Sequence, residues 1–250
     1  MKIIQLNISF NKELRTLLHP KHRKLSLLNH TIHHHGSIKD VIESLRVPHT
    51  EIGQLRVNGE QVNFSYQVQD NDSISVDAHT VPVNPCWPDI LRPKPLPSIR
   101  FMVDVNVAKL CSLLRMTGFD TLCIPELDDP GIAETAAQQK RILLSRDRGL
   151  LKRKIIEHGH LVRAHLPEEQ LREIISFYGL QNIIEPFSRC MNCNGLLAGI
   201  EKEAIRHRLQ PLTKKYYNTF FHCPDCDKIY WSGSHKTGMN QLLVKVLAGL

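Results

Sequence analysis

The chain has 250 residues, of which 42% are hydrophobic and 23% are charged, and its net charge is +7. This composition is typical of a globular protein with one or two domains and excludes a disordered chain. No apolar run approaches the roughly 18–20 residues that span a bilayer. The first residues contain no basic segment followed by an apolar core, so we expect a cytoplasmic protein without a membrane partner.

The excess positive charge lies at the C-terminal end. Residues 186–250 carry nine Lys and Arg against four Asp and Glu, whereas residues 1–85 carry nine against eight. A basic tail suits a polyanion, although such tails also serve solubility. The charge distribution therefore favours a nucleic-acid partner.

Residues 1–80 predict a small α+β domain. The stretch "KIIQLNISF" alternates apolar and polar residues as a strand does, and "SIKDVIESLRV" has helical spacing after a possible N-cap at Ser37. A hairpin is predicted in "EIGQLRVNGEQV", with its turn at Asn58-Gly59, and a closing strand in "DNDSISV". This order resembles the ubiquitin-like fold of sulfur carriers. Because no free Gly-Gly tail follows, we expect a docking role toward a protein partner instead of carrier chemistry.

Residues 81–99 predict a linker. They contain six of the fourteen prolines in the chain. Such a density of proline favours a stiff, extended segment, so we place a domain boundary here.

Residues 100–185 predict an α/β domain with a parallel sheet. The apolar strand "RFMVD" ends at Asp104, and the helical spacing of residues 107–117 follows it. The second strand is "DTLCIP", the next helix is "DDPGIAETAAQQK", and the third strand "RILLS" ends near Asp147. Alternating strands and helices are typical of parallel strands with right-handed crossovers.

Three carboxylates are predicted to lie at one edge of this sheet. Asp104 follows the carboxyl end of the first strand, and Asp147 follows that of the third strand, "RILLS". Asp129 begins the helix that precedes this third strand. A divalent cation would relieve their mutual repulsion, and the neighbouring bases would bind phosphate. The alternative is that each aspartate is only a turn or cap residue and that the basic run is a solvated helix face. These bases are Arg146, Arg148, Lys152 and Arg153, followed by Lys154.

Residues 186–250 contain two Cys-x-x-Cys pairs, which predict a zinc ribbon before a closing helix. The pairs are separated by 29 residues. Zn²⁺ takes four thiolates in a closed tetrahedral site, and two paired turns supply that number. Redox chemistry is the alternative, but two tandem pairs favour a structural metal. The predicted ligands are Cys190, Cys193, Cys223 and Cys226.

The whole chain resembles the Mut-seven C-terminal RNase-domain family, a PIN-like nuclease branch with an appended zinc ribbon and, in some members, a ubiquitin-like domain in front. The most specific stretches are "LLRMTGFDT", "RILLSRDRGLL" and the two cysteine pairs. The resemblance implies hydrolysis of RNA with Mg²⁺ or Mn²⁺. It assigns metal binding to Asp104, Asp129 and Asp147, and it assigns the orientation of carboxylates to Asn106.

One departure from the family pattern leaves the number of metals open. Many PIN-like nucleases carry another acidic residue on an early helix, and residues 107–117 here contain none. Either Asp120, Glu126 or Asp128 takes its place, or a single metal binds. The competing hypothesis for the whole chain is a non-catalytic adaptor that binds nucleic acid through the ribbon and uses the ubiquitin-like domain for docking.

Overall fold

The computed structural model describes residues 3–248, apart from the side chains of residues 234–236. The predicted first strand begins at Lys2 and the predicted closing helix ends at Leu250, so the outermost residues of both predictions lie outside this range. The chain forms two compact units. The first unit comprises Met1–Ile99 and Glu126–Leu161, and the second comprises Arg100–Pro125 and Val162–Leu250.

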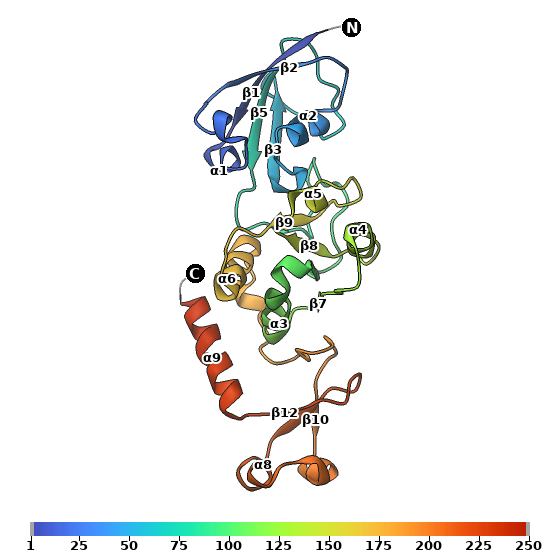
Figure 1. Cartoon of the computed structure of the whole chain (residues 1–250), viewed down its shortest axis with the longest axis vertical. Helices are drawn as coiled ribbons and strands as arrows, with labels where there is room; N and C mark the ends of the chain where they lie inside the picture. The colour runs from blue at the N-terminus through green and yellow to red at the C-terminus, as the bar shows by residue number, and fades with distance from the viewer. Residues whose placement is uncertain (1–2, 249–250) are drawn as a thin grey trace. The chain divides into compact units, whose positions relative to one another are not determined.

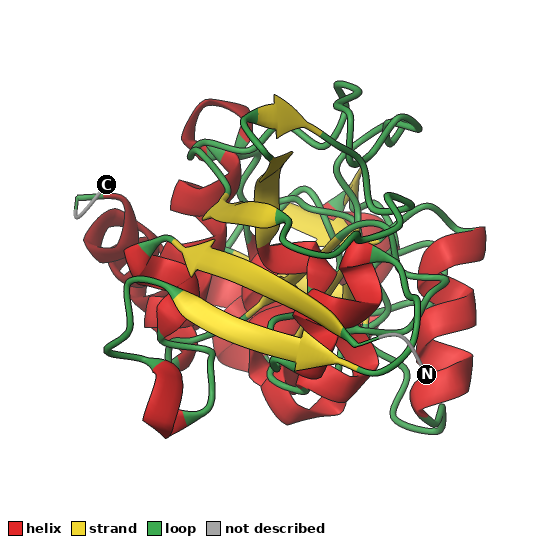
Figure 2. Cartoon of the chain, turned by 90° about the horizontal axis from the view of Figure 1, so that it is seen from above, coloured by secondary structure: helices red, strands yellow, loops and turns green. Residues whose placement is uncertain are grey.

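The ubiquitin-like part of the first unit is a five-stranded mixed sheet with a short helix after its first strand pair (Figure 1). The strand order is β2-β1-β5-β3-β4, in which β1 runs antiparallel to β2 and parallel to β5. Figure 2 shows β1 and β2 as the two long antiparallel strands beside the N-terminus. The elements are β1 (Ile4–Phe10), α1 (Lys12–Arg15), η1 (Pro20–His22), β2 (Leu28–Ile32), α2 (Ile38–Ser44), η2 (His49–Glu51), β3 (Ile52–Val57), β4 (Glu60–Gln61) and β5 (Ser73–Ala78).

Local sequence accounts for these elements. Alternate residues of β1 are buried, as the pattern predicted. Ser37 caps α2 in a capping box with Asp40. The hairpin turns at Asn58 and Gly59, whose φ angles of +52° and +91° suit a type I′ turn.

Residues 126–161 add a second layer to the first unit. It consists of α4 (Asp129–Gln138), β8 (Ile142–Ser145), α5 (Arg148–Leu151) and β9 (Gly159–Leu161). Strands β8 and β9 pair in parallel, and every residue of both is buried. Helices α4 and α5 both pack on β8. A parallel, fully buried pair covered by helices is the arrangement expected of α/β proteins.

A buried polar seam joins the ubiquitin-like part to β9. The Glu51 carboxylate accepts the backbone N–H of Leu161 at 2.7 Å, and His49 Nε2 lies 2.5 Å from the carbonyl of Ile156. At Gly159 a Cβ would come within 2.8 Å of the Leu151 side chain and 3.2 Å of Thr50 Cγ2. A larger residue at position 159 would therefore require Leu151 and η2 to shift, so glycine suits the close approach of β9 to η2.

The predicted linker is built into this seam. Arg92 is only 6% exposed, and its guanidinium donates to four carbonyls at 3.0–3.2 Å: those of His49, Thr50, Ile52 and Glu157. Leu91 and Leu96 are also buried. These side chains fasten residues 81–99 to the rest of the first unit.

The second unit holds another parallel strand pair and the cysteine-rich region. Strand β6 pairs in parallel with β7, and α3 packs against α6. The cysteine-rich region is an antiparallel sheet of order β10-β11-β12. The elements are β6 (Phe101–Val103), η3 (Val105–Val107), α3 (Ala108–Met116), β7 (Thr121–Leu122), α6 (Pro167–Tyr178), η4 (Gln181–Ile183), β10 (Ala198–Ile200), α7 (Lys202–Ile205), η5 (Arg206–Arg208), α8 (Pro211–Tyr216), β11 (Phe220–His222), β12 (Ile229–Trp231) and α9 (Ser234–Leu247).

Within residues 3–248, no helix combines the length and the apolar character that crossing a bilayer requires.

His79 makes the first unit sensitive to acid. Burial and the nearby charge of Arg92 lower the pKa of His79 to about 3, while its ring bonds the Thr50 carbonyl at 2.9 Å. Below pH 6.5 the unfolded chain binds a proton that the folded chain excludes. We therefore expect the free energy of unfolding to fall as the pH drops from 6.5 toward 3, by up to about 1.4 kcal/mol per pH unit from this group.

The measurement is urea unfolding of the wild type and of H79Q from neutral pH to about pH 5. Glutamine keeps a donor for the Thr50 carbonyl but cannot take up a proton in this range. The stability of H79Q should fall less steeply with acid. Parallel pH curves for the two proteins would show that His79 does not govern acid stability.

Candidate functional site

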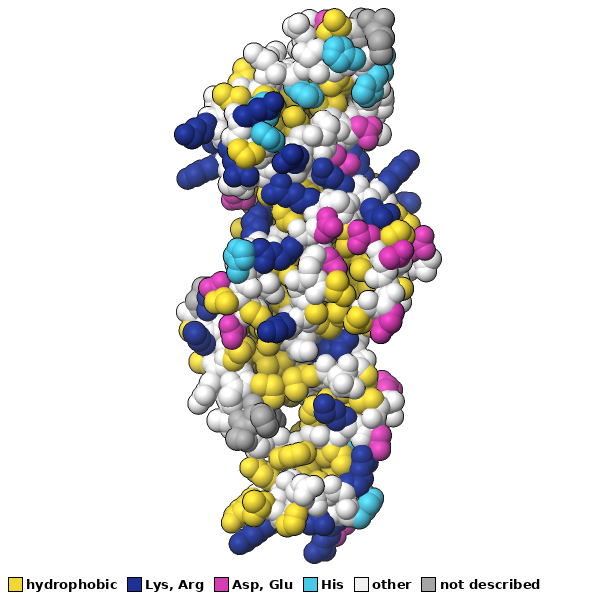
Figure 3. All heavy atoms as spheres, viewed as in Figure 1, with side chains coloured by type: hydrophobic (Ala, Val, Ile, Leu, Met, Phe, Trp, Pro, Cys, Tyr) yellow, Lys and Arg dark blue, Asp and Glu magenta, His cyan; other side chains and the backbone are white. Residues whose placement is uncertain are grey.

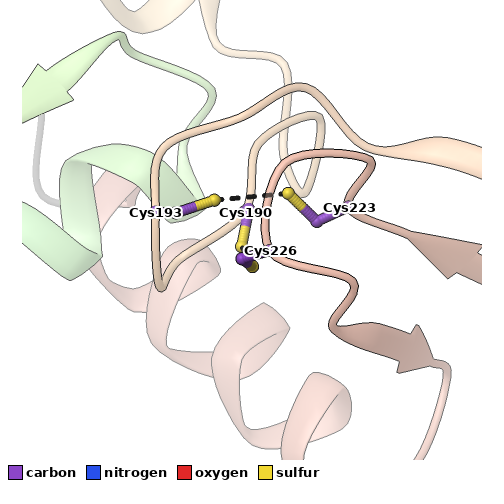
Figure 4. A group of neighbouring side chains, drawn as sticks. All are labelled: Cys190, Cys193, Cys223 and Cys226. Carbon is purple, nitrogen blue, oxygen red and sulfur yellow. Dashed lines mark hydrogen bonds between the residues drawn. The ribbon is translucent and has the colours of Figure 1, made fainter.

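Four cysteine side chains converge at one point in the second unit. Their sulfur atoms all lie within 4.8 Å of one another, and Figure 4 shows them pointing inward from two loops. Cys190 Sγ lies 3.6 Å from Cys226 Sγ, and Cys193 Sγ lies 3.3 Å from Cys223 Sγ. Among the described residues this is the cluster whose ligand atoms could hold a metal ion.

The two cysteine turns have the same backbone geometry. In each turn the carbonyl of the first cysteine accepts the N–H of the residue four positions later, from Asn194 at 2.9 Å and from Asp227 at 2.8 Å. Both of these residues have positive φ, +77° and +56°. In each turn the first cysteine also donates its N–H to the carbonyl five positions later. Two equivalent turns facing each other are what a four-sulfur site requires.

The donor set fits a metal such as zinc. A tetrahedral site with Zn–S bonds of about 2.3 Å needs sulfur atoms roughly 3.8 Å apart. The distances between Cys190 and Cys226 and between Cys193 and Cys223 are close to this value. Burial raises the pKa of Cys190, but hydrogen bonds from the Tyr230 hydroxyl and from backbone N–H groups lower it to about 6 overall. The pKa of Cys193 moves the other way, to about 12, mainly through burial, so a bound metal would have to displace the proton of that thiol.

The first cysteine turn is anchored to the α/β part of the second unit. The Asn194 side chain accepts the N–H of Thr121 at 2.9 Å and donates to Asp120 at 2.8 Å. Arg115 of α3 donates to the carbonyls of Met191 and Asn192. These anchoring residues were not identified from the sequence, because a lone Asn or Arg carries no spacing signal.

Asp104 and Asn106 lie together in the second unit. Asp104 follows β6 and is only 4% exposed. The Asn106 amide donates to the Asp104 carboxylate at 2.5 Å. The contact fixes one carboxylate oxygen.

Asp129 and Asp147 both belong to the first unit. Asp147 follows β8 and caps α5: its Oδ1 accepts the N–H groups of Gly149 at 2.6 Å and Leu150 at 3.4 Å. Among the described residues, no hydrogen bond reaches its Oδ2. Helix α4 packs on β8 and is separated from it by only residues 139–141, so its first residue, Asp129, lies toward the end where β8 finishes.

Two of the four predicted phosphate-binding residues contact the ubiquitin-like part instead. Arg148 donates to the Leu17 carbonyl at 2.7 Å, and Lys152 donates to the Glu43 carbonyl at 2.6 Å. Burial lowers the pKa of Lys152, with the charges of Arg148 and Arg46 acting in the same direction. Arg146 is exposed and Arg153 is half-buried.

The aromatic residues of the ribbon fall into two groups. Phe220 is buried in a small core with Ile205 and Leu209. Tyr216 and Trp231, in contrast, are 64% and 40% exposed, and Lys215 lies 5.2 Å from the centre of the Tyr216 ring. The exposed rings offer stacking surfaces beside cations.

Comparison with known families assigns both parts of the chain. A family model described as the Mut7-C RNAse domain matches residues 99–243, and one described as Mut7-C ubiquitin matches residues 1–83. The resemblance predicted from the sequence is thereby confirmed. No curated protein and no solved structure matches the chain.

The four-sulfur site predicts about one zinc per chain. Replacing Cys223 and Cys226 with serine should abolish zinc binding, because two thiolates cannot close the site. Hydrogen exchange should then increase most in β11 and β12, since the first turn keeps its anchors at Asn194 and Arg115. Elemental analysis and hydrogen exchange of the purified proteins measure both effects.

The control is Cys86→Ser, which removes a thiol of the first unit outside the cluster. It should retain the metal. Zinc bound at the wild-type level by the double variant would contradict the assignment.

Proposed function

Because this chain belongs to the Mut7-C RNAse domain family, we propose that it is a PIN-like, divalent-metal-dependent ribonuclease that hydrolyses RNA phosphodiester bonds. The geometry that best supports the proposal is at Asp147. Its Oδ1 is held by the backbone of α5, which leaves Oδ2 available directly after a buried parallel strand. Ligand-binding residues of α/β proteins lie at such strand ends.

We propose Asp104, Asp129 and Asp147 as the ligands of the catalytic cation, Mg²⁺ or Mn²⁺, because the family resemblance implies them; among the described residues the ligand atoms that converge are the cysteine sulfurs. Carboxylate oxygens are the ligands that these hard cations prefer. Asp104 is buried with an oriented carboxylate, and Asp129 makes no hydrogen bond through its side chain to any described residue. When bound, the ion would supply an activated water and stabilise the charge that develops on the phosphate.

The other predicted site residues are proposed to orient a carboxylate or to bind phosphate. Asn106 orients the carboxylate of Asp104. We assign direct phosphate contacts to Arg146 and Arg153. Arg148 and Lys152 hold backbone carbonyls, and the charge of the Arg148 guanidinium contributes to the local potential.

The second candidate is a non-catalytic RNA-binding adaptor. The exposed rings of Tyr216 and Trp231, with Lys215 close to the former, favour it. Bases stack on such rings with little sequence preference. An adaptor would bind RNA equally well with or without a divalent ion and would leave it intact.

The four cysteines are assigned to a structural zinc ion, because four thiolates leave no open coordination position. We propose a cytoplasmic location, where thiols stay reduced and can bind zinc. A protein partner for the ubiquitin-like part would have to use surfaces other than the buried seam at Glu51 and Arg92.

Asp147→Asn tests the proposed hydrolysis. The variant should lose at least about a hundredfold in Mn²⁺-dependent RNA cleavage, because the amide lacks the charge that holds the cation. Asparagine is an equally good N-cap, so the melting temperature should stay close to that of the wild type. The assay follows labelled single-stranded RNA with Mn²⁺, Mg²⁺ or EDTA.

The matched control is Asp70→Asn, since Asp70 is also exposed and also accepts a backbone N–H, that of Gln5 at 2.8 Å. It should cleave like the wild type. Full activity of Asp147→Asn, or cleavage that persists in EDTA, would refute the metal-dependent assignment.

A further inference from the structure

Positive charge in the ubiquitin-like part is concentrated in one segment. Residues 12–24 contain a single acidic residue, Glu13, and this segment is called the basic strip below. Its cations are Lys12, Arg15, Lys21, Arg23 and Lys24, accompanied by His19 and His22. The net charge of residues 1–85 is close to zero, because the other acidic residues of this segment lie outside residues 12–24.

The fold presents the strip to solvent. Leu14, Leu17 and Leu18 are buried and anchor its apolar side. Lys12, Lys21, Arg23 and Lys24 are exposed, and within the described part of the chain none of them pairs with a carboxylate. Figure 3 shows Lys and Arg side chains gathered over α1 and continuing toward α5.

A hollow within the strip has a cationic lining. It has a volume of about 350 Å³ and is lined by Lys12, Arg15, Thr16 and Arg23. The Nε atom of Arg15 is buried and has no hydrogen-bond partner among the described residues. A buried donor without a partner costs free energy.

The strip is attached to the helix that Asp147 caps. Leu17 lies between α1 and η1, and its carbonyl accepts the Arg148 guanidinium at 2.7 Å. Arg148 is the first residue of α5, directly after Asp147. The basic residues of the ubiquitin-like part and those that follow β8 therefore meet within the first unit.

We propose that the basic strip binds the phosphate backbone of RNA and leads the strand to Asp147. This inference rests on the proposed ribonuclease function and gives its substrate a second binding surface. The strip contains no Phe, Tyr or Trp, so binding there is through phosphates and independent of base sequence. The ubiquitin-like part thus acts as a substrate-binding module of the nuclease.

The test compares K12E/R23E with the matched control K94E/K140E, which reverses two exposed lysines elsewhere in the first unit. Binding of a fluorescent oligouridine is measured by anisotropy without added Mg²⁺ or Mn²⁺, from about 50 to about 200 mM salt. K12E/R23E should bind at least about tenfold more weakly, and its salt slope should fall by about 1.4, or 0.7 for each lost contact. K94E/K140E should keep the wild-type slope.

A second pair, K21E/K24E, covers the case in which K12E/R23E fails to fold, and it should show the same loss. Unchanged binding by a folded strip variant, or an equal loss in K94E/K140E, would overturn the inference. Because binding is measured without the proposed catalytic ion, it is separate from cleavage. Loss of binding in a protein that never cleaves RNA would refute the nuclease and keep the strip. If K12E/R23E cleaves RNA with an unchanged KM, the nuclease is kept and the role of the basic strip is refuted.

Discussion

The buried guanidinium of Arg92 is the contact on which the first unit depends. Its nitrogens donate to carbonyls from η2, from the start of β3 and from the segment before β9. Arginine suits this position because its planar group carries five donors and keeps its charge at any physiological pH. With the buried carboxylate of Glu51 on the N–H of Leu161, it turns three distant pieces of chain into one body. Removing Arg92 would take a donor from four backbone carbonyls, and removing Glu51 would take the acceptor from the N–H of Leu161.

In the second unit, backbone geometry rather than a buried side chain arranges the main feature, a site that fits a metal. The two cysteine turns reach the same conformation through Asn194 and Asp227, whose side chains tolerate positive φ. Asn194 also binds Asp120 and Thr121, so one residue both shapes the turn and secures it to α/β structure. The second turn has fewer such bonds and relies more on the four sulfurs.

Local signals in the sequence identified most elements, because those signals act over a few residues. The alternation in β1, the cap at Ser37 and the turn at Asn58 were all predicted and are present. The basic run after Asp147 shows the limit of such reasoning. Sequence gives the charge of Arg148 and Lys152 but not the acceptor, and their acceptors are carbonyls more than a hundred residues earlier. The proline-rich segment likewise predicted a spacer, because a single Arg92 gives no sign that its side chain will be buried.

The seam around Gly159 also bears on how such a protein can change in evolution. The two family matches meet between residues 83 and 99, which suggests two parts that recombination could exchange. The structure gives the first unit a different boundary, since residues 126–161 belong with the ubiquitin-like fold. A replacement ubiquitin-like part would have to meet three requirements at once. It would need a carboxylate in the place of Glu51 to accept the N–H of Leu161, a surface that packs closely on Gly159, and backbone carbonyls that accept from Arg92. The two parts are therefore expected to be inherited together and to change in step.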